Sequence, residues 1–327
     1  MRTTCNGGPI LVTGLLSVAL TATASAGSSL RVSEFGNLQS AIDVAGDGDT
    51  VVVDFDTEGA VLDKRLILRG MPGRAGGWIT GTPLAMVSTG LLLDTGASGS
   101  ELINLKIRAE VAVASATNLY GLYSDGPADD VVVRGCRFEV DAFGLYLTAG
   151  DPAKGNWVIE RNTIKLEGAT RYFGGSFGVA MIGNWSDMRV AHNKIAGTKP
   201  PGDPQGAGGI AVFGGDDVEL VHNEIAVNVE PAAGSWADAV WLISGTNVTV
   251  AMNDFRGCST TRGPYGVTFE GVLDAQSDMT GLHAFDHIPA SNGDPGRFTI
   301  GGNLSSGSSN RGELSKSEVP LERLFVP

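Results

Sequence analysis

Four side chains in the second half of the chain could carry acid–base chemistry: Asp238, Arg262, Tyr265 and Glu270. The two carboxyls could act on a glycosidic bond, whereas Arg262 or Tyr265 could remove a proton next to a carboxylate. Hydrolysis of a glycoside usually needs two carboxyls about 5–9.5 Å apart. On adjacent strands and five residues out of line, Asp238 and Glu270 would be separated by about 16 Å. This spacing disfavours a simple two-carboxylate hydrolase.

The other reaction removes the proton α to a uronate carboxylate, and its enolate must be neutralised, often by Ca²⁺. Asp238 and Glu270 could supply part of a Ca²⁺ site. The neighbouring positions offer no third acid. The sequence therefore assigns no metal site and requires no cofactor, and Ca²⁺ is the cation to test if the chain is a lyase.

Aromatic side chains accompany these polar groups. Rings with polar edges suit sugar faces, which bind by stacking and by hydrogen bonds, and a guanidinium can hold a carboxylate through two parallel hydrogen bonds. The alternative is that long loops cover the rings as a second core, and that the arginine is a solvated loop charge. The expected substrate-binding residues are Tyr120, Tyr123, Tyr146, Phe177, Phe213, Trp236, Trp241, Arg171 and Tyr172.

An internal repeat positions these residues. Asparagines at 162, 193, 223 and 253 recur at intervals of 31, 30 and 30 residues, each inside a segment of alternating apolar residues. A second strand recurs between them and begins with glycine, as in Gly144–Leu147 and Gly178–Met181. Each copy predicts three short strands and no helix, and stacked copies bury one continuous apolar core. The sequence therefore predicts an all-β, single-stranded parallel β-helix solenoid of about 8–10 coils.

The asparagines have a structural explanation. Stacked about 4.8 Å apart, their amides can bond to one another and to the turn backbone. Cys136 takes the asparagine position in an earlier copy. Cys258 lies four coils away, about 19 Å at that spacing, whereas a disulfide needs Cα atoms within about 7 Å. We expect both thiols to be free.

Residues Leu38–Ala45 predict a short amphipathic helix that would cap the open first coil. The run Leu38–Ile42, the following Gly48–Val51 and the asparagine-centred repeats resemble the pectate-lyase-like right-handed parallel β-helix superfamily. The resemblance covers about residues 36–304, with a degenerate last repeat at Phe298–Asn303, and points to no single family within the superfamily. It implies a right-handed solenoid whose glycine-led strands form the floor of a substrate groove.

The resemblance also bears on catalysis. Asp238 falls on a catalytic aspartate position of the polygalacturonases, but Gly208 and the Pro264–Gly266 segment replace its two expected partners. The function predicted from the sequence is binding of an oligo- or polysaccharide along an aromatic-lined groove, with polysaccharide lyase or glycosidase activity left open. Two alternatives remain: a non-catalytic envelope or extracellular binding or scaffold protein, and an enzyme acting on a small molecule in a loop-covered pocket.

Net charge and the two ends of the chain indicate the expected partners and localisation. With 23 basic and 36 acidic residues the net charge is −13, which argues against nucleic acid and lowers the expectation of a polyuronate partner. Residues 1–26 read as a secretory signal ending in Ala24-Ser25-Ala26, with an anchor helix as the alternative. No later apolar run is long enough to span a bilayer. We expect a secreted or periplasmic monomer, with the β-helix over 27–304 and a polar, possible capping tail over 305–327.

Overall fold

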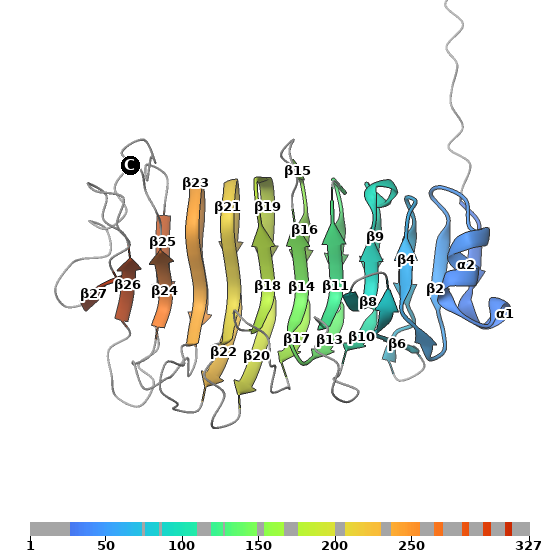
Figure 1. The fold of residues 1–327 in the computed structure, drawn as a ribbon, viewed down its shortest axis with the longest axis horizontal. Coiled ribbons are helices and arrows are strands. Elements are labelled where there is room, and N and C mark those ends of the chain that lie inside the picture. The colour runs from blue at the N-terminus through green and yellow to red at the C-terminus, as the bar shows by residue number, and fades with distance from the viewer. Residues whose placement is uncertain are drawn as a thin grey trace, which may run out of the picture.

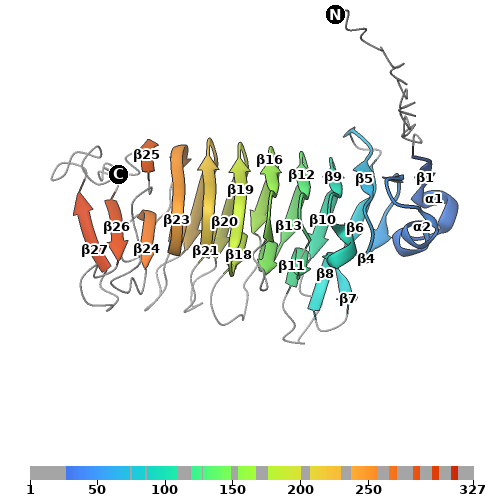
Figure 2. The same cartoon turned by 90° about the horizontal axis from the view of Figure 1, so that it is seen from above.

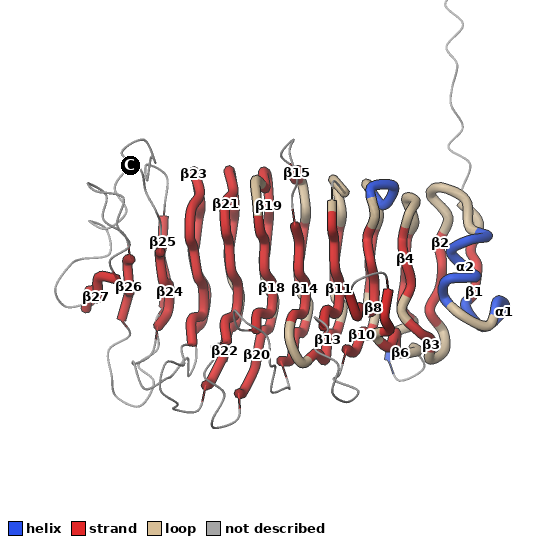
Figure 3. The backbone as a smooth tube through the Cα atoms, viewed as in Figure 1, coloured by secondary structure: helices blue, strands red, loops and turns tan. Residues whose placement is uncertain are grey.

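Short strands with period-two alternation stack into three parallel ladders in the computed structural model, so that each coil of the chain adds one strand to each ladder (Figures 1 and 2). The expected single-stranded parallel β-helix is therefore confirmed, as is its all-β composition (Figure 3). The structure describes residues 27–73, 76–84, 87–109, 119–126, 128–148, 154–166, 176–199, 207–229, 237–255, 265–270, 283–287, 297–301 and 311–315. The predicted signal segment 1–26 lies outside them.

Sheet 1 contains the strand that precedes the asparagine turn of each coil. In spatial order it is built from β1 (Ser29–Arg31), β2 (Thr50–Val53), β5 (Ile67–Gly70), β9 (Glu101–Ile103), β12 (Val132–Arg134), β16 (Val158–Glu160), β19 (Trp185–Ala191), β21 (Ala207–Val221), β23 (Ala237–Phe255) and β25 (His283–His287). The two-residue strand β15 (Lys154–Gly155) pairs with the start of β19.

Sheet 2 follows the asparagine turn. Its strands are β3 (Thr57–Glu58), β6 (Trp78–Thr80), β10 (Lys106–Ala109), β13 (Arg137–Val140), β17 (Thr163–Leu166), β20 (Lys194–Lys199) and β22 (Glu224–Val229), which pairs with the end of β23. In β10 and β13, Ile107, Ala109, Phe138 and Val140 are buried while the residues between them are not, so one file of each strand faces the core.

Sheet 3 carries the glycine-led strands. It contains β4 (Ala60–Leu62), β8 (Val87–Leu93), β11 (Leu119–Asp125), β14 (Phe143–Thr148), β18 (Ser176–Ile182), the first parts of β21 and β23, β24 (Tyr265–Glu270) and β26 (Arg297–Gly301). Two antiparallel strands border it, β7 (Thr82–Leu84) beside β8 and β27 (Arg311–Ser315) beside β26. Gly178 is required in β18, because a Cβ there would lie 2.5 Å from Ile195 Cγ2 and 2.8 Å from the Gly209 carbonyl oxygen.

The asparagine ladder is present as expected. The amide oxygen of Asn193 accepts from both the backbone N–H and the Nδ2 of Asn162 at 3.0 Å, and its own Nδ2 donates to the Ile159 carbonyl at 2.8 Å. Asn223 and Asn253 repeat this pattern, and all four side chains are buried. The ladder satisfies the backbone of a buried turn from one coil to the next.

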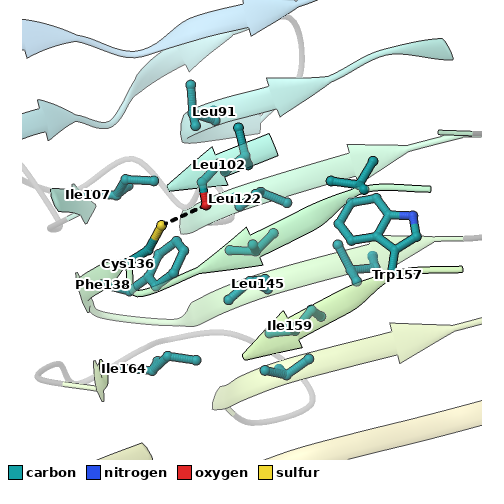
Figure 4. Close-up of a cluster of buried hydrophobic side chains, with 14 of the residues drawn as sticks. Leu91, Leu102, Ile107, Leu122, Cys136, Phe138, Leu145, Trp157, Ile159 and Ile164 are labelled. Carbon is teal, nitrogen blue, oxygen red and sulfur yellow. Dashed lines mark hydrogen bonds between the residues drawn. The ribbon is translucent and has the colours of Figure 1, made fainter. Parts of the chain in front are cut away.

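Cys136 continues the ladder as an apolar residue among core side chains (Figure 4). Its backbone N–H donates to Asn162 Oδ1 at 2.8 Å, and its Sγ contacts the Leu102 carbonyl oxygen at 3.3 Å. The thiol is free, and burial raises its pKa to about 12. Cys258 lies outside the described residues.

Two helices cover the first coil, where one was expected. The predicted helix is α2 (Leu38–Val44), with Asn37 as its N-cap and with Leu38, Ala41 and Ile42 buried. The additional helix is α1 (Val32–Phe35), which ends at the left-handed Gly36. Because these helices bury apolar residues against the coil end, they protect the open edge of the solenoid.

The last repeat was predicted in the wrong register. The segment Phe298–Asn303 was assigned to the asparagine repeat, but β26 pairs with β24 and so extends sheet 3. Strand β25, which was not predicted, pairs with β23 and extends sheet 1 instead. An alternating apolar pattern fits any of the three sheets, and only strand pairing distinguishes them.

Candidate functional site

Seven aromatic side chains lie on the outer face of sheet 3, and we call this set the aromatic strip. Strand register places them in two main rows. One row joins Tyr120, Phe143 and Phe177, and the other passes through Tyr123 and Tyr146, then two alanines, to Trp241. Phe213 lies two residues beyond Ala211 on β21 and pairs with Ile182. The aromatic strip therefore consists of Tyr120, Tyr123, Phe143, Tyr146, Phe177, Phe213 and Trp241.

The two rows differ in exposure. Tyr120, Phe143 and Phe177 are only 2–3% exposed, whereas Tyr123, Tyr146, Phe213 and Trp241 are partly exposed. The alternative of a buried second core therefore fits one row, whereas the other row keeps accessible ring surface. Arg171, Tyr172, Trp236 and Arg262 lie outside the described residues.

The rings form one continuous chain of contacts. Tyr120 contacts Tyr123 at 4.8 Å and Tyr146 at 4.9 Å between ring centroids, and Phe143 contacts Phe177 at 6.2 Å. Trp241 joins Phe177 at 5.8 Å and Phe213 at 5.2 Å. Offset and edge contacts at these distances are favourable for aromatic pairs. The buried row thus fixes the orientation of the partly exposed row.

Two alanines make room for Trp241. Ala211 and Ala180 precede Trp241 in its row, one coil and two coils away, and both are buried beneath the strip. Without larger side chains at these two positions, the indole can extend back across strand β21 to reach Phe177. In the sequence, the only sign of this indole position is that two alanines interrupt a row of aromatic residues.

Backbone register leads from the buried row to the polar candidates. Phe177 pairs with Gly208, Gly208 with Asp238 and Asp238 with Tyr265, so the row passes from rings to polar residues within three coils. Tyr265 pairs with Arg297. Arg297 was not predicted as a site residue, because strand β26 had been assigned to the asparagine repeat. This register places Asp238, Tyr265 and Arg297 on consecutive strands, about 4.8 Å apart.

Glu270 does not join this group. It lies at the far end of β24, five residues beyond Tyr265, and Tyr265 is the position that pairs with Asp238. Five residues correspond to about 16 Å along a strand. The register therefore agrees with the sequence argument that Asp238 and Glu270 are too far apart for direct two-carboxylate hydrolysis.

Titratable groups elsewhere on the coils lie at recurring turns. Asp130, Asn156, Asp187 and Asp217 share a left-handed turn, and Arg161, His192 and His222 share another next to the asparagine ladder. The rings of His192 and His222 stack at 4.8 Å with an interplanar angle of 5°. Within the part of the chain that is described, no group of three or more His, Cys, Asp or Glu side chains could hold a metal ion.

Comparison with known proteins gives few matches. No family model and no curated protein matches the chain. Tailspike protein 2 of the Escherichia coli O157:H7 bacteriophage CAB120 is similar at 12% identity and a TM-score of 0.36, over 84% of this chain and 46% of that one. The enzymatically active domain of tailspike protein 2 of bacteriophage CBA120 is similar at 11% identity and a TM-score of 0.31, over 84% and 47%. The chain spans less than half the length of either tailspike structure. Among the described residues, no helix is long and apolar enough to cross a membrane.

Proposed function

We propose that the protein binds an oligo- or polysaccharide along the aromatic strip. The observation that carries the proposal is the division of the strip into a buried row and a partly exposed row in continuous ring contact. A second core would bury both rows. A row of partly exposed rings held in place by buried ones is suited to stacking against sugar faces.

In this proposal the two rows have different tasks. Tyr123, Tyr146, Phe213 and Trp241 contact the sugar through their rings, and the tyrosine hydroxyls offer polar edges to its hydroxyl groups. Tyr120 and Phe177 support the contacting rings from below. Because the rings stand on strands of a rigid ladder, little conformational entropy is lost when a ligand binds. Arg171, Tyr172 and Trp236 are proposed to add contacts at the edge of the strip.

Catalysis, if present, is proposed for the polar end of the buried row. Asp238 and Tyr265 lie there on adjacent strands, and Glu270 is too distant to complete a hydrolytic pair. This favours a lyase over a glycosidase. In that reaction Tyr265 or Arg262 takes the proton α to a uronate carboxylate, the C–O bond at the β carbon breaks, and the departing sugar oxygen takes up a proton. Neutralisation of the enolate would need a cation, and Asp238 could supply part of the site for Ca²⁺.

Two alternatives remain within the proposal. A non-catalytic envelope or extracellular binding protein would use the same strip without turnover, and a small-molecule enzyme would not need its length. We also propose that residues 1–26 direct export, that the product is secreted or periplasmic, and that it acts as a monomer.

A panel of neutral and uronate polysaccharides tests the proposal. Calorimetric titration measures binding, and the ultraviolet absorbance of unsaturated products and the release of reducing ends measure turnover, each with Ca²⁺ and with a chelator. Binding with an absorbance rise supports the lyase, and binding without turnover supports the non-catalytic alternative. Absence of binding across the panel would contradict the proposed function.

A further inference from the structure

A second charged surface lies on sheet 2, away from the aromatic strip. Five consecutive strands, β6, β10, β13, β17 and β20, place alternate residues on the outer face of this sheet. Of ten such positions five are lysine or arginine and one is glutamate, although acids outnumber bases 36 to 23 in the chain. The ten positions are Trp78, Thr80, Lys106, Arg108, Arg137, Glu139, Thr163, Lys165, Lys194 and Ala196. We call this surface the basic face.

The positive charge of the basic face is only partly compensated. Arg137 Nε donates to Glu139 at 2.8 Å, and Lys194 pairs with Glu224 at 3.1 Å. Lys106 Nζ donates instead to the Gly76 carbonyl oxygen at 3.0 Å, and Arg108 Nε to Thr80 Oγ1 at 3.0 Å. Neither contact neutralises a charge. The side chains of Arg137 and Lys194 are 57% and 61% exposed, so an external ligand can reach the face.

Trp78 holds the strongest part of this charge in place. The guanidinium carbons of Arg108 and Arg137 lie 5.8 and 5.7 Å from the Trp78 ring centroid, and Lys106 is its register partner on the next strand. Cation–π contacts of this length restrict the two arginines. Their freedom is therefore already reduced before an anion binds, which lowers the entropic cost of binding.

The spacing of the charges selects among anionic polymers. The five strands span about 19 Å along the solenoid, and the face carries five positive charges and one negative charge over that length. Double-stranded DNA carries one negative charge per about 1.7 Å, or about 11 over this length, far more than the five positive charges of the face. A polysaccharide with one carboxylate per sugar unit is less densely charged and narrow enough to lie along a single sheet.

We propose that the basic face binds an acidic polysaccharide through carboxylate contacts to Lys106, Arg108 and Arg137, independently of the aromatic strip. The proposal differs from the proposed function in its residues and in its ligand: it requires charge on the polysaccharide, whereas stacking on the aromatic strip does not.

Polygalacturonate is the probe, with neutral dextran as the uncharged control. Binding is measured by calorimetric titration in chelator, which withholds Ca²⁺, at low and at moderate salt. We expect polygalacturonate to bind at low salt, and its affinity to fall as salt screens the contacts. The affinity for dextran should not depend on the residues of the basic face. The triple variant Lys106→Gln/Arg108→Gln/Arg137→Gln should bind about tenfold more weakly, as expected for the loss of several exposed ionic contacts.

Two controls assign the effect. Arg31→Gln/Arg65→Gln/Arg69→Gln makes the same change of net charge outside the basic face and should retain binding. Far-ultraviolet circular dichroism confirms that each variant is folded. The proposal is overturned if polygalacturonate does not bind or if the two triple variants lose affinity equally. Binding of anionic phospholipid vesicles in place of polygalacturonate would also overturn it.

Discussion

Phe177 and Trp241 lie with ring centroids 5.8 Å apart, although strand β21 separates their two strands. Strands two places apart in a sheet are about 9.6 Å from each other, so the indole must extend back across the ladder. The two small residues in its row, Ala180 and Ala211, permit this. The position of the Trp241 indole thus depends on the absence of larger side chains at positions 180 and 211.

Enlarging Ala211 should displace the indole. In Ala211→Leu we expect the ring contact between Phe177 and Trp241 to be lost and the free energy of unfolding to fall by about 1–3 kcal/mol, because the site is already filled. Glycan affinity should fall with it. Ala196→Leu, at a partly exposed position on sheet 2, is the matched control and should change neither quantity appreciably. Denaturant titration and near-ultraviolet circular dichroism measure the effects, and an unchanged near-ultraviolet spectrum would contradict the expectation.

The asparagine ladder should dominate stability. Asn193→Ala removes the acceptor of the Asn162 backbone N–H and the donor to the Ile159 carbonyl, both buried. Leaving such groups unpaired costs about 1–3 kcal/mol each, so we expect a loss of roughly 2–5 kcal/mol. Asn184→Ala, at an exposed turn, should stay within about 0.5 kcal/mol of wild type. Equal unfolding midpoints of the two variants in urea would show that the ladder contributes no more to stability than an exposed turn does.

The Cys136 thiol should make stability sensitive to alkali. Burial raises its pKa to about 12, above the ordinary value of 9.0, so the folded state holds the proton more tightly than the unfolded state does. Its contribution is complete below about pH 9 and is lost as the pH rises towards 12. In a background with Cys5 and Cys258 replaced by serine, Cys136→Ala should remove this dependence. A thiol reagent that labels native Cys136 as fast as the unfolded chain would disprove the burial argument.

Asp54 should make the capped end sensitive to acid. Its burial opposes ionisation, but hydrogen bonds from Ser33 Oγ at 2.6 Å and Ser33 N at 3.0 Å outweigh that effect, with Arg31 at 3.7 Å, so its pKa is lowered. The stabilisation is therefore present above the unfolded pKa of about 4 and is lost as the pH falls through the lower folded value. We expect Asp54→Asn to flatten the acid limb of a stability–pH profile measured by urea unfolding. A profile that matches wild type would exclude this role.

The architecture could be predicted from the sequence because the repeated residues meet requirements of the backbone, namely hydrogen bonds in a buried turn and close approach of neighbouring strands. Asn162, Asn193 and Asn223 recur since each must satisfy the same buried turn, and Gly178 stays small because a neighbouring strand approaches closely. Such requirements occur once in every coil, so they are readable without coordinates. The cap helix was predictable for the same reason, from its apolar spacing.

The site was less predictable because it depends on register and on side-chain direction. Strand β26 has an alternation that fits any sheet, and its misassignment hid Arg297 from the row of Asp238 and Tyr265. The reach of Trp241 over its alanines depends on a rotamer that no spacing encodes. The basic face follows from the alternation in β10 and β13, but it lies on a different sheet from the catalytic candidates.

Calorimetric titration of a glycan that binds the wild-type protein, repeated with Trp241→Ala and with Trp78→Ala, tests the central claim most directly. A neutral glycan is the sharpest probe, because it does not engage the basic face. Loss of one stacking ring should weaken binding about tenfold or more in Trp241→Ala, while Trp78→Ala, on sheet 2, should bind as wild type does. Unchanged affinity in Trp241→Ala, or equal losses in both variants, would contradict a glycan site on the aromatic strip.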